Sequence, residues 1–103
     1  MKWIEIIELR STGDTLAQIE KLIQEIIDQA ENKSGQRIVR LYTQMKIETD
    51  LSIHLVHDSS KAKNRGSSLG IRLVSALKPY GLVNHTIWIE KEKDSLINKI
   101  WKE

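Results

Sequence analysis

Hydrophobic and polar positions alternate along this chain with two different periods. Three segments follow the period of two expected of β-strands: residues 36–46, 51–57 and 82–90. A fourth strand is predicted at residues 3–10, which are rich in β-forming residues with apolar side chains on both faces. Two others repeat apolar side chains every three or four residues, which predicts helices from residue 15 to residues 32–35, and from residue 67 or 68 to residue 79. The predicted order is strand, helix, strand, strand, helix, strand.

This order repeats a strand-helix-strand unit twice, which is the split arrangement of ferredoxin-like folds. We therefore predict an α+β protein with a ferredoxin-like βαββαβ fold, a four-stranded antiparallel sheet and two helices on one face. Residues 1–90 would form this single domain. Residues 91–103 would be a charged C-terminal tail whose apolar positions are spaced as on one side of a short helix: Leu96, Ile97, Ile100 and Trp101.

Both faces of the predicted sheet carry apolar side chains, although two helices can cover only one of them. In the second strand, Val39 and Leu41 share one face, whereas Ile38 and Tyr42 share the other. A monomer would expose a larger apolar patch than soluble domains usually tolerate. The sequence therefore predicts a homodimer that buries the sheet face opposite the helices, with the tail at the dimer seam or folded back on its own chain.

The composition argues against several classes of protein. The 103 residues include no cysteine, which excludes disulfides, thiolate metal sites and cysteine nucleophiles. The net charge of +2 and the aromatic fraction of 5%, with no phenylalanine, argue against nucleic acid as a partner. The longest apolar runs are far shorter than the roughly 20 residues of a membrane span, and the N-terminus does not resemble a signal peptide. We expect a cytoplasmic protein without a membrane partner.

Histidine supplies the candidate proton-transfer groups, because its charge changes near neutral pH. His54 and His85 are the candidate catalytic residues, since both lie on predicted strands that could face a cavity. His54 and His57 are three residues apart in one strand and point to opposite faces, so they cannot bind one metal together. We predict no metal site and no cofactor. Each histidine could equally be a partly buried strand residue without a chemical role.

The other candidate residues form two binding groups. Tyr42, Asn84 and Trp88 could form a polar and aromatic pocket wall for a flat organic molecule, or Trp88 could pack in the core or the dimer seam. At the start of the second helix, free backbone N–H groups and the helix dipole favour a phosphate or carboxylate. The candidate anion-binding residues there are Lys61, Lys63, Arg65 and Ser67, and a solvated loop explains the same basic residues.

The segment from residue 57 to residue 88 resembles a known superfamily. It reads GSSLG at residues 66–70, then Leu73, Ala76 and Leu77, then YGLVNHTIW at residues 80–88. This pattern resembles the dimeric α/β-barrel superfamily, which includes stress-responsive barrel proteins and antibiotic-biosynthesis monooxygenases. The resemblance implies two ferredoxin-like sheets paired into one barrel, with helices outside and a cavity within or beside each sheet. Heme-degrading members carry an Asn on the first strand, and residues 3–10 contain none, which argues against heme degradation.

Three functions of different classes stay open. The protein could be a dimeric barrel that binds a small organic molecule, or that oxidises it without a cofactor, as the resemblance implies. It could instead be a non-catalytic binding or regulatory module whose basic loop holds an anion. It could also act in assembly, through its sheet and C-terminal tail. An enclosed pocket beside Tyr42, His54 or Trp88 would favour the first function, and a solid sheet interface would favour the third.

Overall fold

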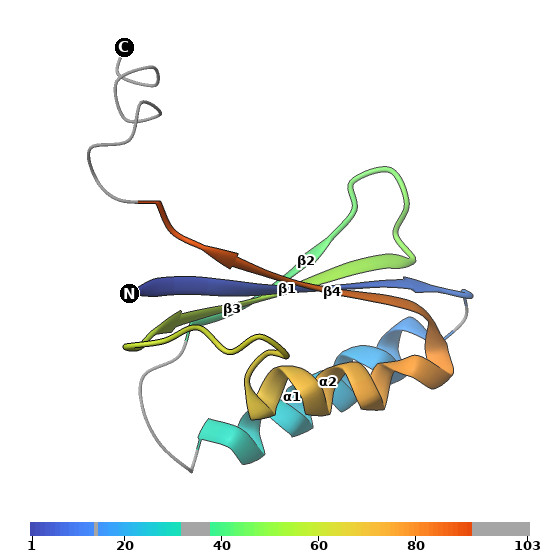
Figure 1. The fold of residues 1–103 in the computed structure, drawn as a ribbon. Coiled ribbons are helices and arrows are strands. Elements are labelled where there is room, and N and C mark those ends of the chain that lie inside the picture. Colours follow the sequence, from blue (N-terminus) through green and yellow to red (C-terminus); the bar gives the residue numbers. More distant parts are fainter. Residues whose placement is uncertain (14, 32–37, 92–103) are drawn as a thin grey trace.

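The computed structural model describes residues 1–13, 15–31 and 38–91 (Figure 1). Its elements follow the predicted order: β1 (Lys2–Ser11), α1 (Leu16–Glu31), β2 (Ile38–Thr43), β3 (Asp50–Asp58), α2 (Ser68–Leu77), a short 3-10 helix η1 (Lys78–Tyr80) and β4 (Gly81–Ile89). The predicted tail falls outside the described residues from position 92 onward.

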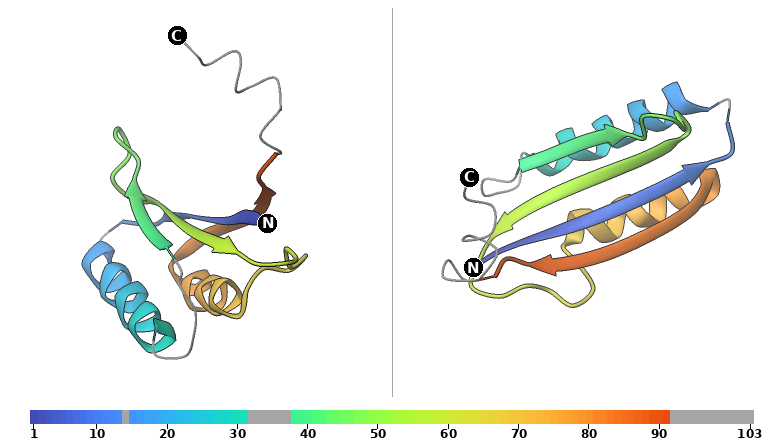
Figure 2. Two further views of the ribbon diagram at one scale, coloured as in Figure 1. Left: turned by 90° about the vertical axis from the view of Figure 1, so that its left-hand side faces the viewer. Right: turned by 90° about the horizontal axis from the view of Figure 1, so that it is seen from above.

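The four strands form one antiparallel sheet in the order β2-β3-β1-β4. Both helices lie on the same side of this sheet, below it in Figure 1, and the two views of Figure 2 show the other side uncovered by either helix. The predicted α+β fold with a four-stranded antiparallel sheet and two helices on one face is therefore confirmed. We call the side away from the helices the open face.

The second strand is shorter than predicted, because the chain turns earlier. Residues 36–46 alternate in sequence, but within the described residues the strand runs only from Ile38 to Thr43. The backbone of Gln44 donates to the Asp50 carbonyl at 3.0 Å, and the Gln44 side chain accepts from the Lys46 backbone at 2.9 Å. These two bonds already belong to the turn between β2 and β3.

The core lies between the sheet and the helices. Every second residue of β1 from Trp3 to Ser11 is buried, and β3 alternates in the same way. Each helix adds one buried stripe, as its apolar spacing predicted. The resulting cluster contains Ile7, Leu9, Ile19, Ile23, Ile26, Ile27, Leu51, Ile53, Leu55, Leu69, Leu73 and Leu77.

The open face changes from apolar to polar along the strands. Strand pairing aligns Ile38, Val56, Ile4 and Trp88 in one row that crosses all four strands, which we call the apolar row. Two rows further along lies a polar row, made by Tyr42, Ser52, Glu8 and Asn84. Trp88 and Ile38 keep 57% and 51% of their surface exposed, so the apolar row is uncovered in the single chain.

Candidate functional site

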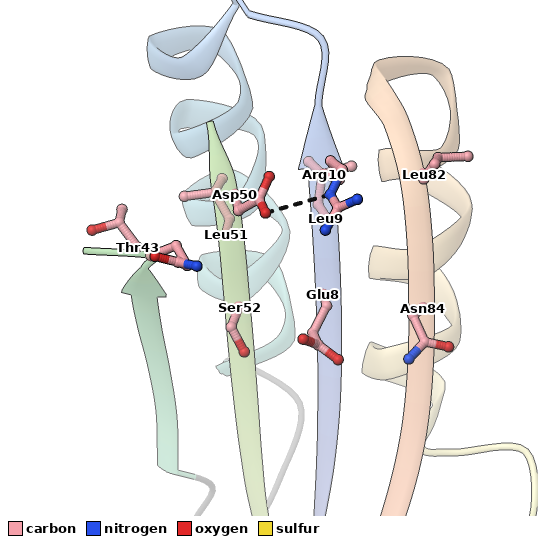
Figure 3. Close-up of a pocket in the computed structure, with 10 residues that line it drawn as sticks. Glu8, Leu9, Arg10, Thr43, Asp50, Leu51, Ser52, Leu82 and Asn84 are labelled. Carbon is pink, nitrogen blue, oxygen red and sulfur yellow. Dashed lines mark ion pairs between the residues drawn. The ribbon is translucent and has the colours of Figure 1, made fainter. Parts of the chain in front are cut away.

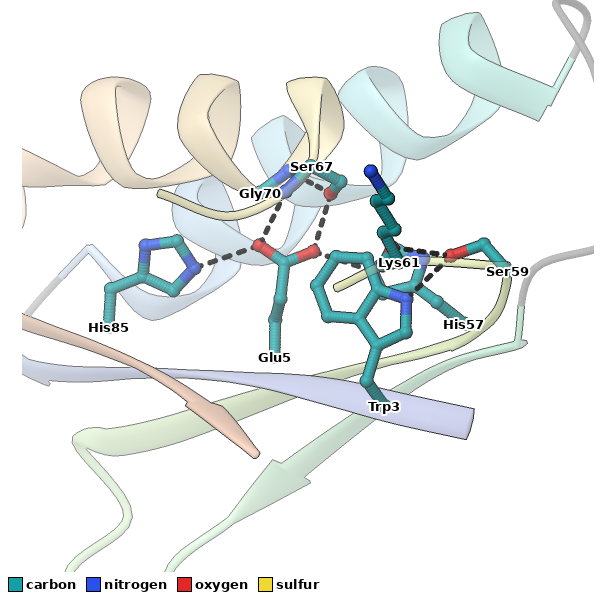
Figure 4. A network of polar contacts seen from close by, with 8 residues as sticks. All are labelled: Trp3, Glu5, His57, Ser59, Lys61, Ser67, Gly70 and His85. Atoms are coloured by element: carbon teal, nitrogen blue, oxygen red, sulfur yellow. Dashed lines mark hydrogen bonds and ion pairs between the residues drawn. The ribbon is translucent and has the colours of Figure 1, made fainter. Parts of the chain in front are cut away.

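A carboxylate lies fully buried between the sheet and helix α2 (Figure 4). Glu5 is in the middle of β1, on the face that the helices cover, and none of its surface is exposed. Its Oε2 is 2.5 Å from His57 Nε2, and its Oε1 is 2.9 Å from His85 Nε2. The histidines come from β3 and β4, the two strands that flank β1. We call Glu5, His57, His85 and Ser67 the carboxylate cluster.

Helix α2 aims its N-terminus at this carboxylate. Ser67 is the N-cap: its side chain accepts from the Gly70 backbone N–H at 3.0 Å. The Ser67 backbone N–H donates to Glu5 Oε1 at 3.0 Å, and the Ser67 hydroxyl donates to Glu5 Oε2 at 2.5 Å. Free N–H groups and the helix dipole make a helix N-terminus a favourable place for an anion. Here the anion is a side chain of the protein itself.

Two glycines make room for the carboxylate. A Cβ atom added to Gly66 or to Gly70 would overlap Glu5 Oε1, and one on Gly66 would also overlap the His85 ring. Gly66 additionally has a φ of +92°, a conformation that other residues rarely adopt. The glycines at 66 and 70 therefore reflect the close approach of α2 to the Glu5 side chain.

Opposing effects act on the ionisation of Glu5. Burial alone would raise the pKa of this carboxyl, because a low-dielectric interior disfavours the charged form. Hydrogen bonds from the Ser67 hydroxyl, His57, His85 and the Ser67 backbone outweigh burial and lower the pKa below its usual value of 4.5. Glu5 is therefore an anion at neutral pH. An ionised carboxylate only accepts hydrogen bonds, so both Nε2 atoms must carry a proton.

Trp3 packs against the carboxylate cluster on the side nearer the end of the sheet. Its ring stacks on the His57 ring, with centroids 4.2 Å apart and planes at 28°. The indole N–H of Trp3 donates to Ser59 Oγ at 2.9 Å, and Ser59 Oγ donates to the Lys61 carbonyl at 2.9 Å. These contacts attach the beginning of the loop between β3 and α2 to the sheet.

A second candidate site is a polar concavity on the open face (Figure 3). Its volume is about 540 Å³, within the usual range for small-molecule pockets. The Arg10 Nε lies 3.5 Å from Asp50 Oδ2 along one wall, while Asp50 Oδ1 is buried without a hydrogen-bond partner among the described residues. The lining residues are Glu8, Leu9, Arg10, Thr43, Gln44, Asp50, Leu51, Ser52, Leu82 and Asn84.

The architecture is similar to that of several solved proteins. Rv0793 from Mycobacterium tuberculosis superposes with a TM-score of 0.67 at 17% identity, over 92% of this chain and 100% of that one. SnoaB, a cofactor-independent oxygenase from Streptomyces nogalater, gives 0.68 at 12% identity, over 90% of this chain and 96% of that one. A Caulobacter crescentus protein described as an antibiotic biosynthesis monooxygenase superposes with a TM-score of 0.67 at 14% identity, over 88% of this chain and 91% of that one.

The chain shares the fold of these solved proteins, with a four-stranded antiparallel sheet and two helices on one face. The resemblance that the sequence suggested is thereby confirmed at the level of the fold. No protein-family model matches the sequence, and no curated protein matches it significantly. None of the helices in the described part of the chain is long and apolar enough to cross a membrane.

The two predicted catalytic histidines lie on opposite faces of the sheet. His85 belongs to the carboxylate cluster, and 17% of its side chain is exposed. His54 lies on the open face, with its Nε2 3.0 Å from Ser52 Oγ and its ring tilted at 4.6 Å against Tyr42. The two residues therefore cannot serve one reaction centre within a single chain.

The predicted pocket wall is spread over the open face. Tyr42 and Asn84 stand at opposite ends of the polar row, with β3 and β1 between them. Trp88 belongs to the apolar row, and its indole N–H donates to Thr86 Oγ1 at 2.9 Å. Of these three residues, only Asn84 lines the polar concavity. Within one chain they do not form a common wall, and their role in binding stays a prediction.

The predicted anion site is already occupied by Glu5. Both donors of Ser67, the backbone N–H and the hydroxyl, point at this carboxylate, so an external anion would have to displace it. Lys61, Lys63 and Arg65 are exposed, and their binding of an anion stays a prediction. Among residues 1–13, 15–31 and 38–91, no three His, Asp or Glu side chains are grouped so that they could hold a metal ion.

Sequence reasoning missed Glu5. The signal was present, because Glu5 shares a strand face with Trp3, Ile7 and Leu9, and a charge at such a position needs partners. The partners could not be read from the sequence, since they come from β3, β4 and the start of α2, at least 52 residues away.

Proposed function

We propose that this protein binds a small organic molecule in the polar concavity of the open face. The observation that supports this proposal is the concavity itself, with its volume of about 540 Å³ and its mixed lining. Asn84, Ser52 and Glu8 can hydrogen-bond polar groups of a ligand, while Leu82 keeps 74% of its surface exposed beside them and can contact an apolar part. Pockets of this size and composition commonly bind small ligands.

The experiment is a thermal-shift screen of small hydroxylated aromatic compounds against the wild-type protein. A compound that raises the melting temperature should lose most of its effect in the variants Asn84→Ala and Leu82→Ala. Arg40→Ala is the matched control, because Arg40 lies on the open face but does not line the concavity. If the shift is the same in all three variants, the ligand binds elsewhere.

The protein is also proposed to be a homodimer that pairs through its open face. Four large apolar side chains remain exposed on that face: Ile38, Tyr42, Leu82 and Trp88. A standard interface of roughly 800 Å² per partner would cover such a surface and close the concavity from above. Sedimentation should give about twice the 11.9 kDa mass of the chain, and a single species at the chain mass would contradict the dimer. The cytoplasmic location stays a prediction.

Oxidation without a cofactor is a second candidate function, favoured by the hydrogen bond between His85 and Glu5. It would use the helix-covered face, where 17% of the His85 side chain is exposed, and not the polar concavity. The buried Glu5 carboxylate accepts the proton on His85 Nε2. In a neutral imidazole, Nδ1 is then the nitrogen that can accept a proton from a substrate. With no cofactor, the electrons that reduce oxygen must come from the substrate, so it would be an electron-rich phenol that loses a proton first.

Oxygen consumption with a hydroquinone as the probe tests this second function. The rate above the protein-free background should fall in His85→Gln and stay unchanged in His54→Gln, whose side chain is on the opposite face. If the wild-type protein adds nothing to the background rate, oxidation at His85 is refuted, and ligand binding in the polar concavity is tested separately by the thermal shifts.

A further inference from the structure

We propose that the ligand of the polar concavity is an organic amine that binds as a cation. Its ammonium group would contact the Glu8 carboxylate, and its apolar part would contact Leu82. This inference rests on the proposed function, because it assigns a chemical class to the ligand of the same concavity. It adds that charge, as well as size and shape, decides which molecules bind.

The lining of the concavity is negatively charged, although the chain as a whole carries a net charge of +2. Glu8 and Asp50 contribute two carboxylates and Arg10 contributes one guanidinium, so the formal charge of the lining is −1. A concave surface lined by an excess of one charge attracts ligands of the opposite charge. The concavity therefore favours a cation over a neutral molecule or an anion.

The cation in the lining is already paired. Arg10 Nε lies 3.5 Å from Asp50 Oδ2, so these two charges largely compensate each other. Glu8 lies two residues before Arg10 on the same face of β1. It forms no ion pair with any residue in the ranges 1–13, 15–31 and 38–91. The Glu8 carboxylate is thus the charge in the concavity that a ligand can pair with.

Three hydrogen-bond acceptors lie side by side around the proposed ammonium position. Strand pairing places Ser52 on one side of Glu8 and Asn84 on the other (Figure 3). Neighbouring strands are about 4.8 Å apart, so side-chain oxygens from all three residues can reach one group above Glu8. An ammonium group has three N–H donors and no acceptor, which matches these three oxygens. A carboxylate ligand has no donor to offer and would be repelled by Glu8.

An apolar surface lies within reach of the same position. Leu82 is two residues before Asn84 on the same face of β4, and 74% of its surface is exposed. Two residues along a strand span about 7 Å. An amine joined to an aromatic ring by two carbon atoms has a comparable length, so its ring would lie on Leu82 while its ammonium group contacts Glu8.

The proposed dimer would strengthen this preference. A second copy that closes the concavity from above would remove water from the Glu8 carboxylate. A carboxylate that loses its water without gaining a partner is unfavourable, whereas one paired with a cation in the same space is not. Closure of the concavity and binding of a cation would therefore favour each other.

Calorimetric titration of the full-length protein at neutral pH and low salt tests the ligand class with three probes. Tyramine, tyrosol and 4-hydroxyphenylacetate share the same ring and a chain of two carbon atoms, but are cationic, neutral and anionic. We expect the Kd of tyramine to be about tenfold lower than that of tyrosol, because its hydrogen bond to Glu8 is charge-assisted. The anion should bind most weakly of the three.

The variant Glu8→Gln should raise the Kd of tyramine to that of tyrosol and leave tyrosol unchanged. Glu25→Gln is the matched control, because Glu25 is an exposed glutamate on α1, on the other side of the sheet, and its substitution changes the net charge by the same amount. The control should bind all three probes like the wild type.

Three results would overturn the proposal: no tyramine binding at millimolar concentration, equal affinities for all three probes, or the same loss of tyramine affinity in both glutamine variants. If tyrosol or 4-hydroxyphenylacetate binds more tightly than tyramine and loses affinity in Leu82→Ala, the ligand class is wrong, but small-molecule binding in the concavity stands. If neither these probes nor any compound of the thermal-shift screen binds, both proposals fail.

Discussion

The substitution Glu5→Ala tests how much the fold depends on its buried carboxylate. Glu5 is fully buried and accepts four hydrogen bonds, two from Ser67 and one each from His57 and His85. The alanine variant removes the acceptor and leaves four donors facing a cavity. These donors gave up their hydrogen bonds to water when the protein folded, and in the variant no protein acceptor replaces the water.

The expected loss is large relative to the stability of a small domain. Removal of one partner from a buried, charged pair typically costs about 3 to 5 kcal/mol. The total free energy of unfolding of such domains is roughly 5 to 15 kcal/mol, so the variant should fold with much reduced stability. Each kcal/mol lowers the melting temperature of a domain of this size by about 4 °C or more, so the decrease should be at least roughly 12 °C.

Urea denaturation followed by circular dichroism measures this loss at neutral pH. Glu8→Ala is the matched control, because Glu8 is on the same strand but exposed on the open face. The control should unfold like the wild type within experimental error. Added formate should stabilise Glu5→Ala more than it stabilises the wild type, since it supplies a carboxylate to the same donors. If Glu5→Ala and Glu8→Ala unfold alike, Glu5 does not hold the sheet and α2 together.

Three further predictions follow from the same cluster. Gly70→Ala should destabilise the protein in thermal melts, although glycine to alanine in a helix normally stabilises by about 1 kcal/mol, because the new Cβ overlaps Glu5. Ser67→Ala should cost about 1 to 2 kcal/mol in urea denaturation through loss of the helix cap, whereas Ser68→Ala at the exposed neighbouring position should not. The folded-state pKa of Glu5 lies below 4.5, so its contribution to stability is complete above about pH 4.5 and is lost as pH falls through the folded pKa. Denaturation of Glu5→Gln and wild type at several pH values should therefore give a stability difference that narrows in acid, and a constant difference would contradict the assignment.

The fold was predictable because its strands and helices obey their periods almost everywhere. In β3, Leu51, Ile53 and Leu55 alternate with polar residues, and these three apolar side chains are buried, as is His57 further along the same face. A one-residue slip in such a strand would exchange its buried and exposed faces, so the pattern determines which face meets the helices. The end of β2 was less predictable, because hydrogen bonds of Gln44 with Asp50 and Lys46 replace strand pairing there.

The site was less predictable, because its residues meet only through strand order and helix placement. The spacing of His54 and His57 predicted that they point to opposite faces, but the sequence could not say which of the two shares a face with His85. That distinction follows from β1 lying between β3 and β4. The glycines at 66 and 70 can be read from the sequence, but their reason is the close approach of the start of α2 to the Glu5 side chain, which only the structure shows.

Strand β1 supplies carboxylates to both faces of the sheet, an arrangement that would separate stability from the proposed binding. Glu5 takes up both donors of Ser67 at the N-terminus of α2, so this helix end has little capacity left for an external anion. Glu8, three residues later, points to the open face and lines the polar concavity. Paired substitutions of these two residues change the same chemical group on one strand, so a loss of stability at Glu5 and a loss of ligand binding at Glu8 would assign separate roles to the two faces.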